Sequence, residues 1–175
     1  MLIPAADTTS AFKGIGKIKP IKVLQQNPRF VETFGRLGET WTIPEEVKAD
    51  LETFTCVIYG RHRFTSVNDL RHQLLKERCG NDPLLENHNV DLASMPPCKE
   101  TLQEHIKRSN YQVAIWKRAL EPMSDVPAAS TGHGWIDVNG TLEPKWSTER
   151  TPYYLQILLT FLWTFLTLMM MKKTL

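Results

Sequence analysis

The sequence predicts an all-α protein, in which an irregular helical domain is followed by one C-terminal transmembrane helix. Three observations lead to this prediction. Between residues 18 and 120, apolar residues recur at three- and four-residue intervals, as on the buried face of a helix. Capping residues, prolines and glycines bound these segments. Residues 153–171 form an uncharged apolar run of bilayer length. No segment shows a convincing alternation of apolar and polar residues, so we expect no β-strand.

The first helical segment follows a glycine-rich turn. Residues 13–20 read KGIGKIKP, in which two glycines flank one apolar residue. This spacing predicts a tight turn with outward-pointing backbone N–H groups, and Pro20 suits the first turn of a helix over residues 21–26. Five positive side chains and no negative one lie between Thr8 and Val31: Lys13, Lys17, Lys19, Lys22 and Arg29. Amides, a helix N-terminus and lysines together favour phosphate.

We therefore predict a phosphate- or DNA-binding site in this segment. Its residues are Gly14, Gly16, Lys17, Lys19 and Lys22. The alternative is an ordinary glycine turn on a solvated basic surface. We predict no cofactor and no metal site, because the histidines and cysteines of the chain show no recognised metal-binding spacing.

Two helices are predicted next. Over residues 28–38, Phe30, Phe34 and Leu37 share one face, and Gly38 suits a helix stop. Residues 42–45 have the pattern of a capping box at the start of a helix over residues 44–59. The apolar face of that helix comprises Val47, Leu51, Phe54 and Ile58.

Two more helices complete the body. Ser66 and Asp69 are expected to cap a helix over residues 67–78 with Leu70 and Leu74 inward. A longer helix is predicted over residues 99–119. Its apolar spacing comprises Leu102, Ile106, Val113, Trp116 and Leu120. Four cations lie off this face: Lys107, Arg108, Lys117 and Arg118. We expect them on a solvated surface, with contact to nucleic acid as the alternative.

Residues 121–152 are rich in proline and glycine and predict an extended linker with little core of its own. Trp135 and Trp146 are expected to pack onto the helical body. The triplet from Asn139 to Thr141 is an N-glycosylation sequon, which matters only where this part of the chain faces the lumen.

The run from Tyr153 to Met171 contains no charged residue, proline or glycine. At 1.5 Å per residue, a helix of this length spans about 28 Å, close to the thickness of the hydrocarbon layer. Tyrosines at one end and Lys172 and Lys173 at the other suit the two interfaces. The predicted partner is therefore the lipid bilayer. The alternatives are a buried core helix or an accidentally translated tail.

Composition and targeting signals bear on location. The net charge is +2, so any attraction to nucleic acid has to be local. Cys56, Cys79 and Cys98 are widely spaced, as expected for reduced, buried thiols on the cytosolic side. We find no signal-peptide pattern and expect a single-pass membrane protein with a cytosolic body. The final four residues also resemble a dilysine retrieval signal of the endoplasmic reticulum, which requires the opposite orientation of the tail.

Residues 7–24, DTTSAFKGIGKIKPIKVL, resemble the helix-hairpin-helix segment of the flap-endonuclease (PIN-like 5′-nuclease) superfamily. In that family the hairpin holds the backbone of duplex DNA through glycine amides, lysines and often a potassium ion. The resemblance implies that Gly14, Gly16 and Lys17 contact phosphate, and that Asp7 matches the last carboxylate of a two-metal cluster.

The chain departs from this family where catalysis would require agreement. The other metal-binding carboxylates of the family lie upstream, and six residues precede Asp7 here. The family's glycine before that aspartate is replaced by Ala5 or Ala6. One carboxylate does not hold the two cations of in-line phosphodiester cleavage. We therefore expect no catalytic activity.

Residues from Phe34 through Trp135 resemble a group of uncharacterised, transposon-related animal proteins, in which a nuclease-like region precedes a helical region. The likeness covers roughly residues 7–146, and both ends are expected to be shortened relative to that group. The predicted parts are a helix-hairpin-helix-like remnant (1–38), a helical region (39–120), a linker (121–152) and a transmembrane helix (153–171).

The sequence thus predicts a non-catalytic, single-pass membrane-anchored helical protein. The alternative is a remnant of a transposon-derived nuclease that binds the DNA backbone without reading its sequence.

Overall fold

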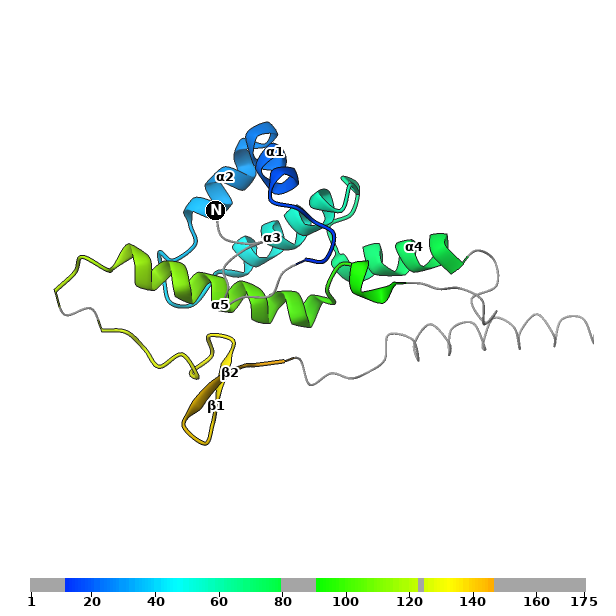
Figure 1. Cartoon of the computed structure of the whole chain (residues 1–175). Coiled ribbons are helices and arrows are strands. Elements are labelled where there is room, and N and C mark those ends of the chain that lie inside the picture. The colour runs from blue at the N-terminus through cyan, green and yellow to red at the C-terminus, as the bar shows by residue number, and fades with distance from the viewer. Residues whose placement is uncertain (1–11, 80–90, 123–124, 147–175) are drawn as a thin grey trace, which may run out of the picture.

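A computed structural model describes residues 12–79, 91–122 and 125–146. The described residues form a mostly helical domain with a small two-stranded hairpin (Figure 1). The helices are α1 (Ile18–Gln26), α2 (Pro28–Gly35), α3 (Glu45–Ile58), α4 (Val67–Cys79), the short 3-10 helix η1 (Leu92–Ser94) and α5 (Lys99–Lys117). The strands are β1 (Trp135–Val138) and β2 (Thr141–Pro144). Within these ranges the prediction of a helical domain is confirmed.

The predicted transmembrane helix, residues 153–171, lies outside the described residues, as does Asp7. Among the residues that the structure describes, no helix is both long enough and apolar enough to cross a membrane.

The first two helices pack against α3, and α2 does so through aromatic rings. Asn27 separates α1 from α2, and its side-chain amide donates to the carbonyl of Val23 at 2.8 Å. The rings of Phe30 and Phe34 meet the ring of Phe54 edge-on, with centroids 5.3 and 4.9 Å apart. The predicted apolar spacing of this segment is therefore confirmed, although α2 ends at Gly35 and Leu37 is buried in the turn that follows.

Helix α3 carries the core of the molecule, and its predicted apolar face is confirmed. Val47, Leu51, Phe54 and Ile58 are all buried. The predicted capping box is wrong, because the N-cap of α3 is Pro44, which has no side-chain donor or acceptor. Two glutamates in the first turn, Glu45 and Glu46, stabilise the start of the helix, because their negative charges lie at the positive end of the helix dipole.

Helix α4 begins where the sequence predicts. The hydroxyl of Ser66 accepts a hydrogen bond from the backbone N–H of Asp69 at 3.3 Å, and Leu70 and Leu74 are buried.

Cys56, on α3, is also buried, and this burial raises the pKa of its thiol to about 12. The thiol of Cys56 thus behaves as a small core group, as predicted.

Helix α5 is tied to the α2–α3 connection by one buried side chain. Asn110 is 2% exposed, and its side-chain oxygen accepts a hydrogen bond from the backbone N–H of Gly38 at 2.8 Å. Its side-chain nitrogen donates to the carbonyls of Thr40 and Trp41 at 2.9 and 3.1 Å. Gly38 has φ +75° and lies so close to α5 that a Cβ there would meet the backbone nitrogen of Ala114 at 2.7 Å. The turn is therefore fixed by tertiary contact with α5 as well as by its backbone conformation.

The expectation of no β-strand is wrong at residues 135–144. β1 and β2 pair antiparallel, with Trp135 opposite Pro144 and Val138 opposite Thr141. The two-residue turn between them is Asn139-Gly140, with φ of 54° and 82°. An Asn-Gly pair with positive φ at both positions matches the right-handed twist of the strands that it joins. These two strands therefore form within the stretch predicted as an extended linker.

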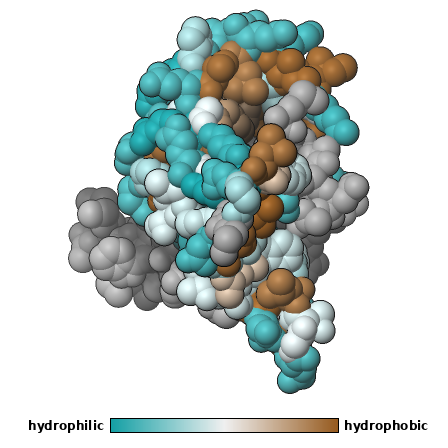
Figure 2. All heavy atoms as spheres, turned by 90° about the vertical axis from the view of Figure 1, so that its left-hand side faces the viewer, coloured by the Kyte–Doolittle hydropathy of each residue, from teal (hydrophilic) through white to brown (hydrophobic). Residues whose placement is uncertain are grey.

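Two expectations for α5 are also wrong, since Arg108 is 2% exposed whereas Trp116 and Leu120 are 52% and 98% exposed. The hairpin lies against the middle of α5 and covers Arg108, while the end of α5 extends past the core (Figure 1). Viewed toward that end of the molecule, the surface is largely hydrophilic, with hydrophobic side chains near its top and along its middle (Figure 2).

Candidate nucleic-acid interface

The predicted glycine turn is present and open. Gly14 has φ +81°, and the N–H of Ile15 donates to the carbonyl of Phe12 at 3.1 Å, which closes the turn before it. The N–H of Lys19 donates to the carbonyl of Gly16 at 3.3 Å as α1 begins. A Cβ at Gly14 or Gly16 would meet nothing within 4 Å. The backbone of this turn is thus accessible from outside.

Three of the five local cations remain available to a ligand. The ammonium of Lys13 pairs with the carboxylate of Asp91 at 3.0 Å, and the guanidinium of Arg29 pairs with Asp50. Lys17, Lys19 and Lys22 are exposed and form no ion pair with any described residue. The predicted binding lysines are therefore the ones that the structure leaves unpaired within the described chain.

The start of α1 adds to the positive potential. Lys17 occupies the N-cap position without a side-chain capping bond, and the first turn of α1 holds no acidic residue. The positive end of the helix dipole is thus not offset by an acidic side chain in that turn. Gly14, Gly16, Lys17 and Lys19 lie together in this turn and helix start, and Lys22 lies one turn further along α1.

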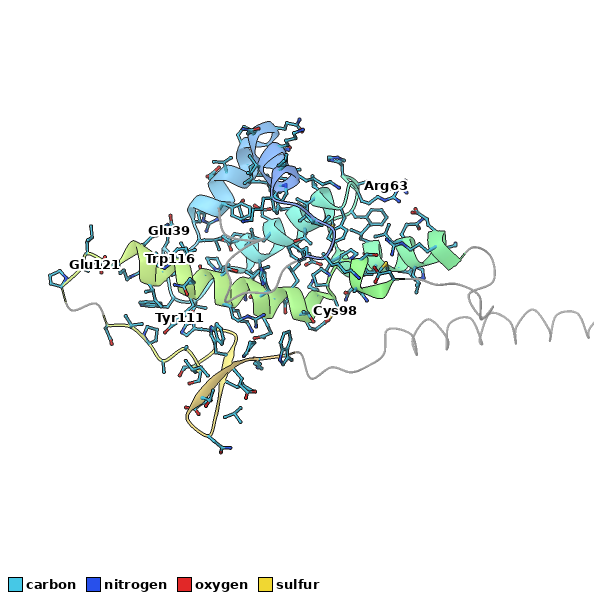
Figure 3. All side chains as sticks on the ribbon, viewed as in Figure 1. Glu39, Arg63, Cys98, Tyr111, Trp116 and Glu121 are labelled. Atoms are coloured by element: carbon cyan, nitrogen blue, oxygen red, sulfur yellow. The ribbon has the colours of Figure 1, made fainter. Side chains whose placement is uncertain are left out.

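The structure brings a second basic segment to the same place. A Cβ built at Gly60, in the loop between α3 and α4, would lie 4.0 Å from the ammonium nitrogen of Lys19. Arg61, His62 and Arg63 follow in that loop. His62 and Arg63 are exposed, and the guanidinium carbon of Arg63 lies 5.4 Å from the ring centroid of Phe64 (Figure 3).

We call the surface formed by Gly14, Gly16, Lys17, Lys19, Lys22, His62 and Arg63 the basic surface. The sequence shows residues 61–63 as a basic loop, but it gives no sign that this loop lies against Lys19, because about 40 residues separate them. Arg61 belongs less to this surface, since its guanidinium pairs with Glu77 at 2.5 Å.

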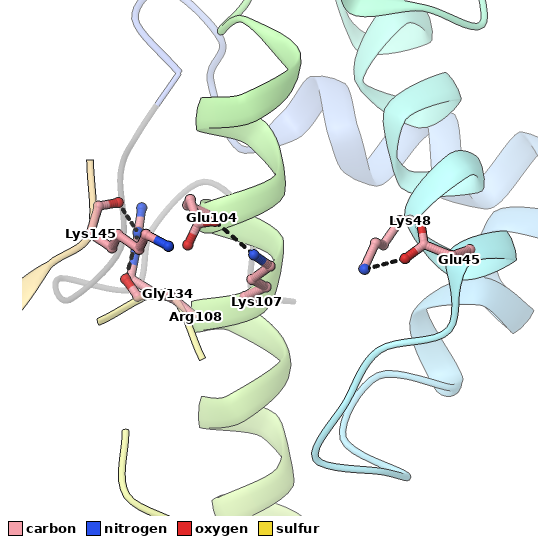
Figure 4. Close-up of polar contacts among 7 residues, drawn as sticks. All are labelled: Glu45, Lys48, Glu104, Lys107, Arg108, Gly134 and Lys145. Carbon is pink, nitrogen blue, oxygen red and sulfur yellow. Dashed lines mark hydrogen bonds and ion pairs between the residues drawn. The ribbon is translucent and has the colours of Figure 1, made fainter. Parts of the chain in front are cut away.

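The cations of α5 have structural contacts instead. Arg108 donates to the carbonyls of Gly134 and Lys145 at 3.0 and 3.3 Å (Figure 4), and burial lowers the pKa of its guanidinium. Lys117 donates to the carbonyl of Gly35 at 2.7 Å, and Arg118 to that of Gly38 at 2.8 Å. These residues hold segments of the fold together, so we do not place them in a nucleic-acid site.

In chemical terms, the basic surface offers backbone amides and ammonium groups but no specific geometry for bases. Lysines and amides of this kind bind phosphate oxygens and carry no direct sequence information. Among the described residues, no three His, Cys, Asp or Glu side chains gather as a metal site.

The chain matches no family model, no curated protein and no solved structure. The resemblance to flap endonucleases and to transposon-related proteins therefore remains a prediction from the sequence.

Proposed function

We propose that the helical body binds the phosphate backbone of duplex nucleic acid through the basic surface, without cleaving it. The observation that carries this proposal is that the ammonium of Lys19 lies near the loop at Gly60, which brings two separate basic segments of the chain close together. The resemblance of residues 7–24 to a DNA-binding hairpin supports the same conclusion.

Charge and geometry suit this function. The basic surface holds three lysines and one arginine with no ion pair to a described residue, next to a helix start. Each phosphate neutralised by such a side chain releases condensed counterions, so affinity falls steeply as salt rises. Since lysine ammonium groups and backbone amides bind phosphate oxygens without reading the bases, we expect similar affinity for duplexes of different sequence.

The test is a titration of fluorescein-labelled duplex DNA with the full chain in mild detergent, followed by fluorescence anisotropy. The double variant Lys17→Glu/Lys19→Glu should bind at least about tenfold more weakly than the natural chain, with a salt dependence lower by about one counterion per lost contact. Arg63→Glu should weaken binding in the same direction.

The matched control is Lys76→Glu/Lys145→Glu, which changes the net charge equally. Both side chains are exposed and lie outside the basic surface. Equal loss of affinity in the two double variants would mean that binding follows overall charge, and the proposal would be abandoned.

A second candidate function is supported by the sequence: a single-pass membrane anchor. The 19 uncharged residues from Tyr153 to Met171 are the supporting observation. In this proposal the tail enters the bilayer of the endoplasmic reticulum or another internal membrane, and the non-catalytic helical body stays on the cytosolic side.

This anchor is tested by fractionating cells that express the chain with or without residues 153–175. The full chain should remain with membranes after extraction with alkaline carbonate, because a spanning helix satisfies its own backbone groups in lipid. The shortened chain should be released. Release of both forms would exclude the anchor and leave the nucleic-acid proposal untouched.

A further inference from the structure

A cavity of about 230 Å³ opens between α4, α5 and the segment that precedes α5, beside Tyr59 at the end of α3. Its walls are mainly apolar: Phe12, Met95, Pro96, Pro97, Leu102 and Trp146. An engineered cavity of about 150 Å³ holds benzene, so this one has room for one aromatic ring and a short substituent. Its volume therefore sets the size of a ligand at roughly ten non-hydrogen atoms.

One polar wall of the cavity carries a cation. The guanidinium of Arg71, on α4, donates through Nη1 to the carbonyl of Pro96. Arg71 is one of the residues that line the cavity, so its wall includes a positive charge, for which a ligand carboxylate is the complementary group.

The neighbours of Arg71 do not neutralise it. The hydroxyl of Tyr59 donates to the carbonyl of Met95 at 3.3 Å, and burial raises the pKa of this phenol to about 12, so it stays uncharged. Lys13, at the exposed rim, is paired with Asp91. Among the described residues that line the cavity there is no aspartate or glutamate. The charge complementary to this lining is negative.

We propose that this cavity binds a small organic acid, with one carboxylate against Arg71 and a body the size of one ring between the apolar walls. Among the described lining residues, Arg71 is the one arginine or lysine without an ion pair, so a monoanion matches it, whereas a dianionic phosphate would leave one negative charge without a partner. Nothing in this proposal depends on the basic surface.

The probe is 4-fluorophenylacetate, followed by fluorine NMR as the full chain is added in detergent, with empty micelles as the blank. We expect saturable binding with a Kd of about 1 mM or tighter, in line with the affinity that ten non-hydrogen atoms supply. The neutral amide 4-fluorophenylacetamide should bind at least about tenfold more weakly, because it loses the charge-assisted hydrogen bond.

Two variants localise the binding. Arg71→Gln should weaken it at least about tenfold, whereas Lys76→Gln, which removes the same charge from an exposed position on the same helix, should not change it. Ala93→Phe fills the cavity from an exposed lining position and should abolish binding while the helical circular-dichroism signal is retained.

The proposal is overturned if the acid shows no saturable binding beyond that of empty micelles. It is overturned equally if the amide binds as tightly as the acid, or if Ala93→Phe folds and still binds.

Discussion

A few buried polar side chains determine how distant segments meet α5. Asn110 holds the turn after α2, and Arg108 holds both ends of the hairpin. His133, 7% exposed, stacks on the ring of Tyr111 with centroids 4.8 Å apart and meets Trp41 at 6.4 Å. Tyr111 lies on the side of α5 that faces the hairpin (Figure 3). At these positions, hydrogen bonds and ring contacts attach the distant segments to α5.

His133 should make the stability of the fold depend on pH. Burial lowers the pKa of its imidazole below the ordinary value of 6.5, and a hydrogen bond to the backbone of Trp41 acts partly against this shift. The unfolded chain therefore binds the proton more readily than the folded chain does. The contribution of neutral His133 is complete above about pH 6.5 and is lost as the pH falls through the folded pKa.

Urea unfolding of the natural chain and of His133→Gln, at pH 7.5 and 5.0, measures this effect. The variant should lose about 1 kcal/mol at pH 7.5, the scale of one ring-stacking contact. It should then lose less further stability at pH 5.0 than the natural chain does. The control is His72→Gln, on the exposed surface of α4, which should keep the natural pH dependence. An identical pH dependence for His133→Gln would contradict the argument.

At the scale of helices and strands, local periodicity predicted the helices well. The apolar faces of α2 and α3 and the N-terminal cap of α4 depend on residues a few positions apart in the sequence. They can therefore be recognised from the sequence alone. The hairpin also has a local signal, because Asn139-Gly140 is the commonest type of two-residue hairpin turn. The same residues form a glycosylation sequon, and the sequence analysis predicts the sequon but not the two strands.

The end of α5 shows a different limit of sequence reasoning. Trp116 continues the apolar spacing of α5, yet it is half exposed because none of the described elements covers that end of the helix. Arg108 breaks the spacing, yet it is buried because a hairpin about 26 residues later accepts its hydrogen bonds. The periodicity of α5 alone therefore predicts neither the exposure of Trp116 nor the hairpin that covers Arg108.

Gly134 and Gly132 offer a matched test of how the hairpin docks. Both have positive φ, +82° and +81°. A Cβ at Gly134 would lie 2.6 Å from the carbonyl oxygen of Glu104, on α5, whereas one at Gly132 would meet nothing within 4 Å. Alanine at either position carries the same backbone strain, but only alanine at Gly134 also pushes the hairpin away from α5.

We expect Gly132→Ala to cost about 1 kcal/mol of unfolding free energy. Gly134→Ala should cost about 2–4 kcal/mol, because overpacking adds to the strain. Urea unfolding gives both numbers, and hydrogen exchange over residues 135–144 should accelerate in Gly134→Ala alone. Equal costs for the two variants would show that the close approach to α5 does not hold the hairpin.

For the whole molecule, the basic surface shows what a sequence leaves undetermined about a site. The glycine turn and its lysines form a local pattern and were predicted by residue number. Loop 61–63 lies near them because α1 packs against α3, which brings the ammonium of Lys19 close to Gly60. Likewise, the acid-binding cavity combines residues from Phe12 to Trp146, and no part of its lining is recognisable as a motif.

The orientation of the proposed anchor decides on which side of a membrane the helical body lies. Lys145 and Arg150 precede the apolar run and Lys172 and Lys173 follow it, so the balance of positive residues does not decide the orientation. A cytosolic body is the orientation that the sequence analysis predicts. The hairpin places Asn139 on an exposed turn, where a lumenal enzyme would reach its sequon, so the state of Asn139 reports the orientation.

Expression in cells of the chain with a second sequon appended after Leu175 separates the two orientations. A cytosolic body predicts one glycan, removable by endoglycosidase, on the appended sequon and none on Asn139. Asn139→Gln should then leave the mass unchanged. Since Asn139 is exposed at the tip of its turn, failure to modify it cannot be attributed to burial. A glycan lost in Asn139→Gln would place the body in the lumen, where the proposed contact with nucleic acid would have no partner.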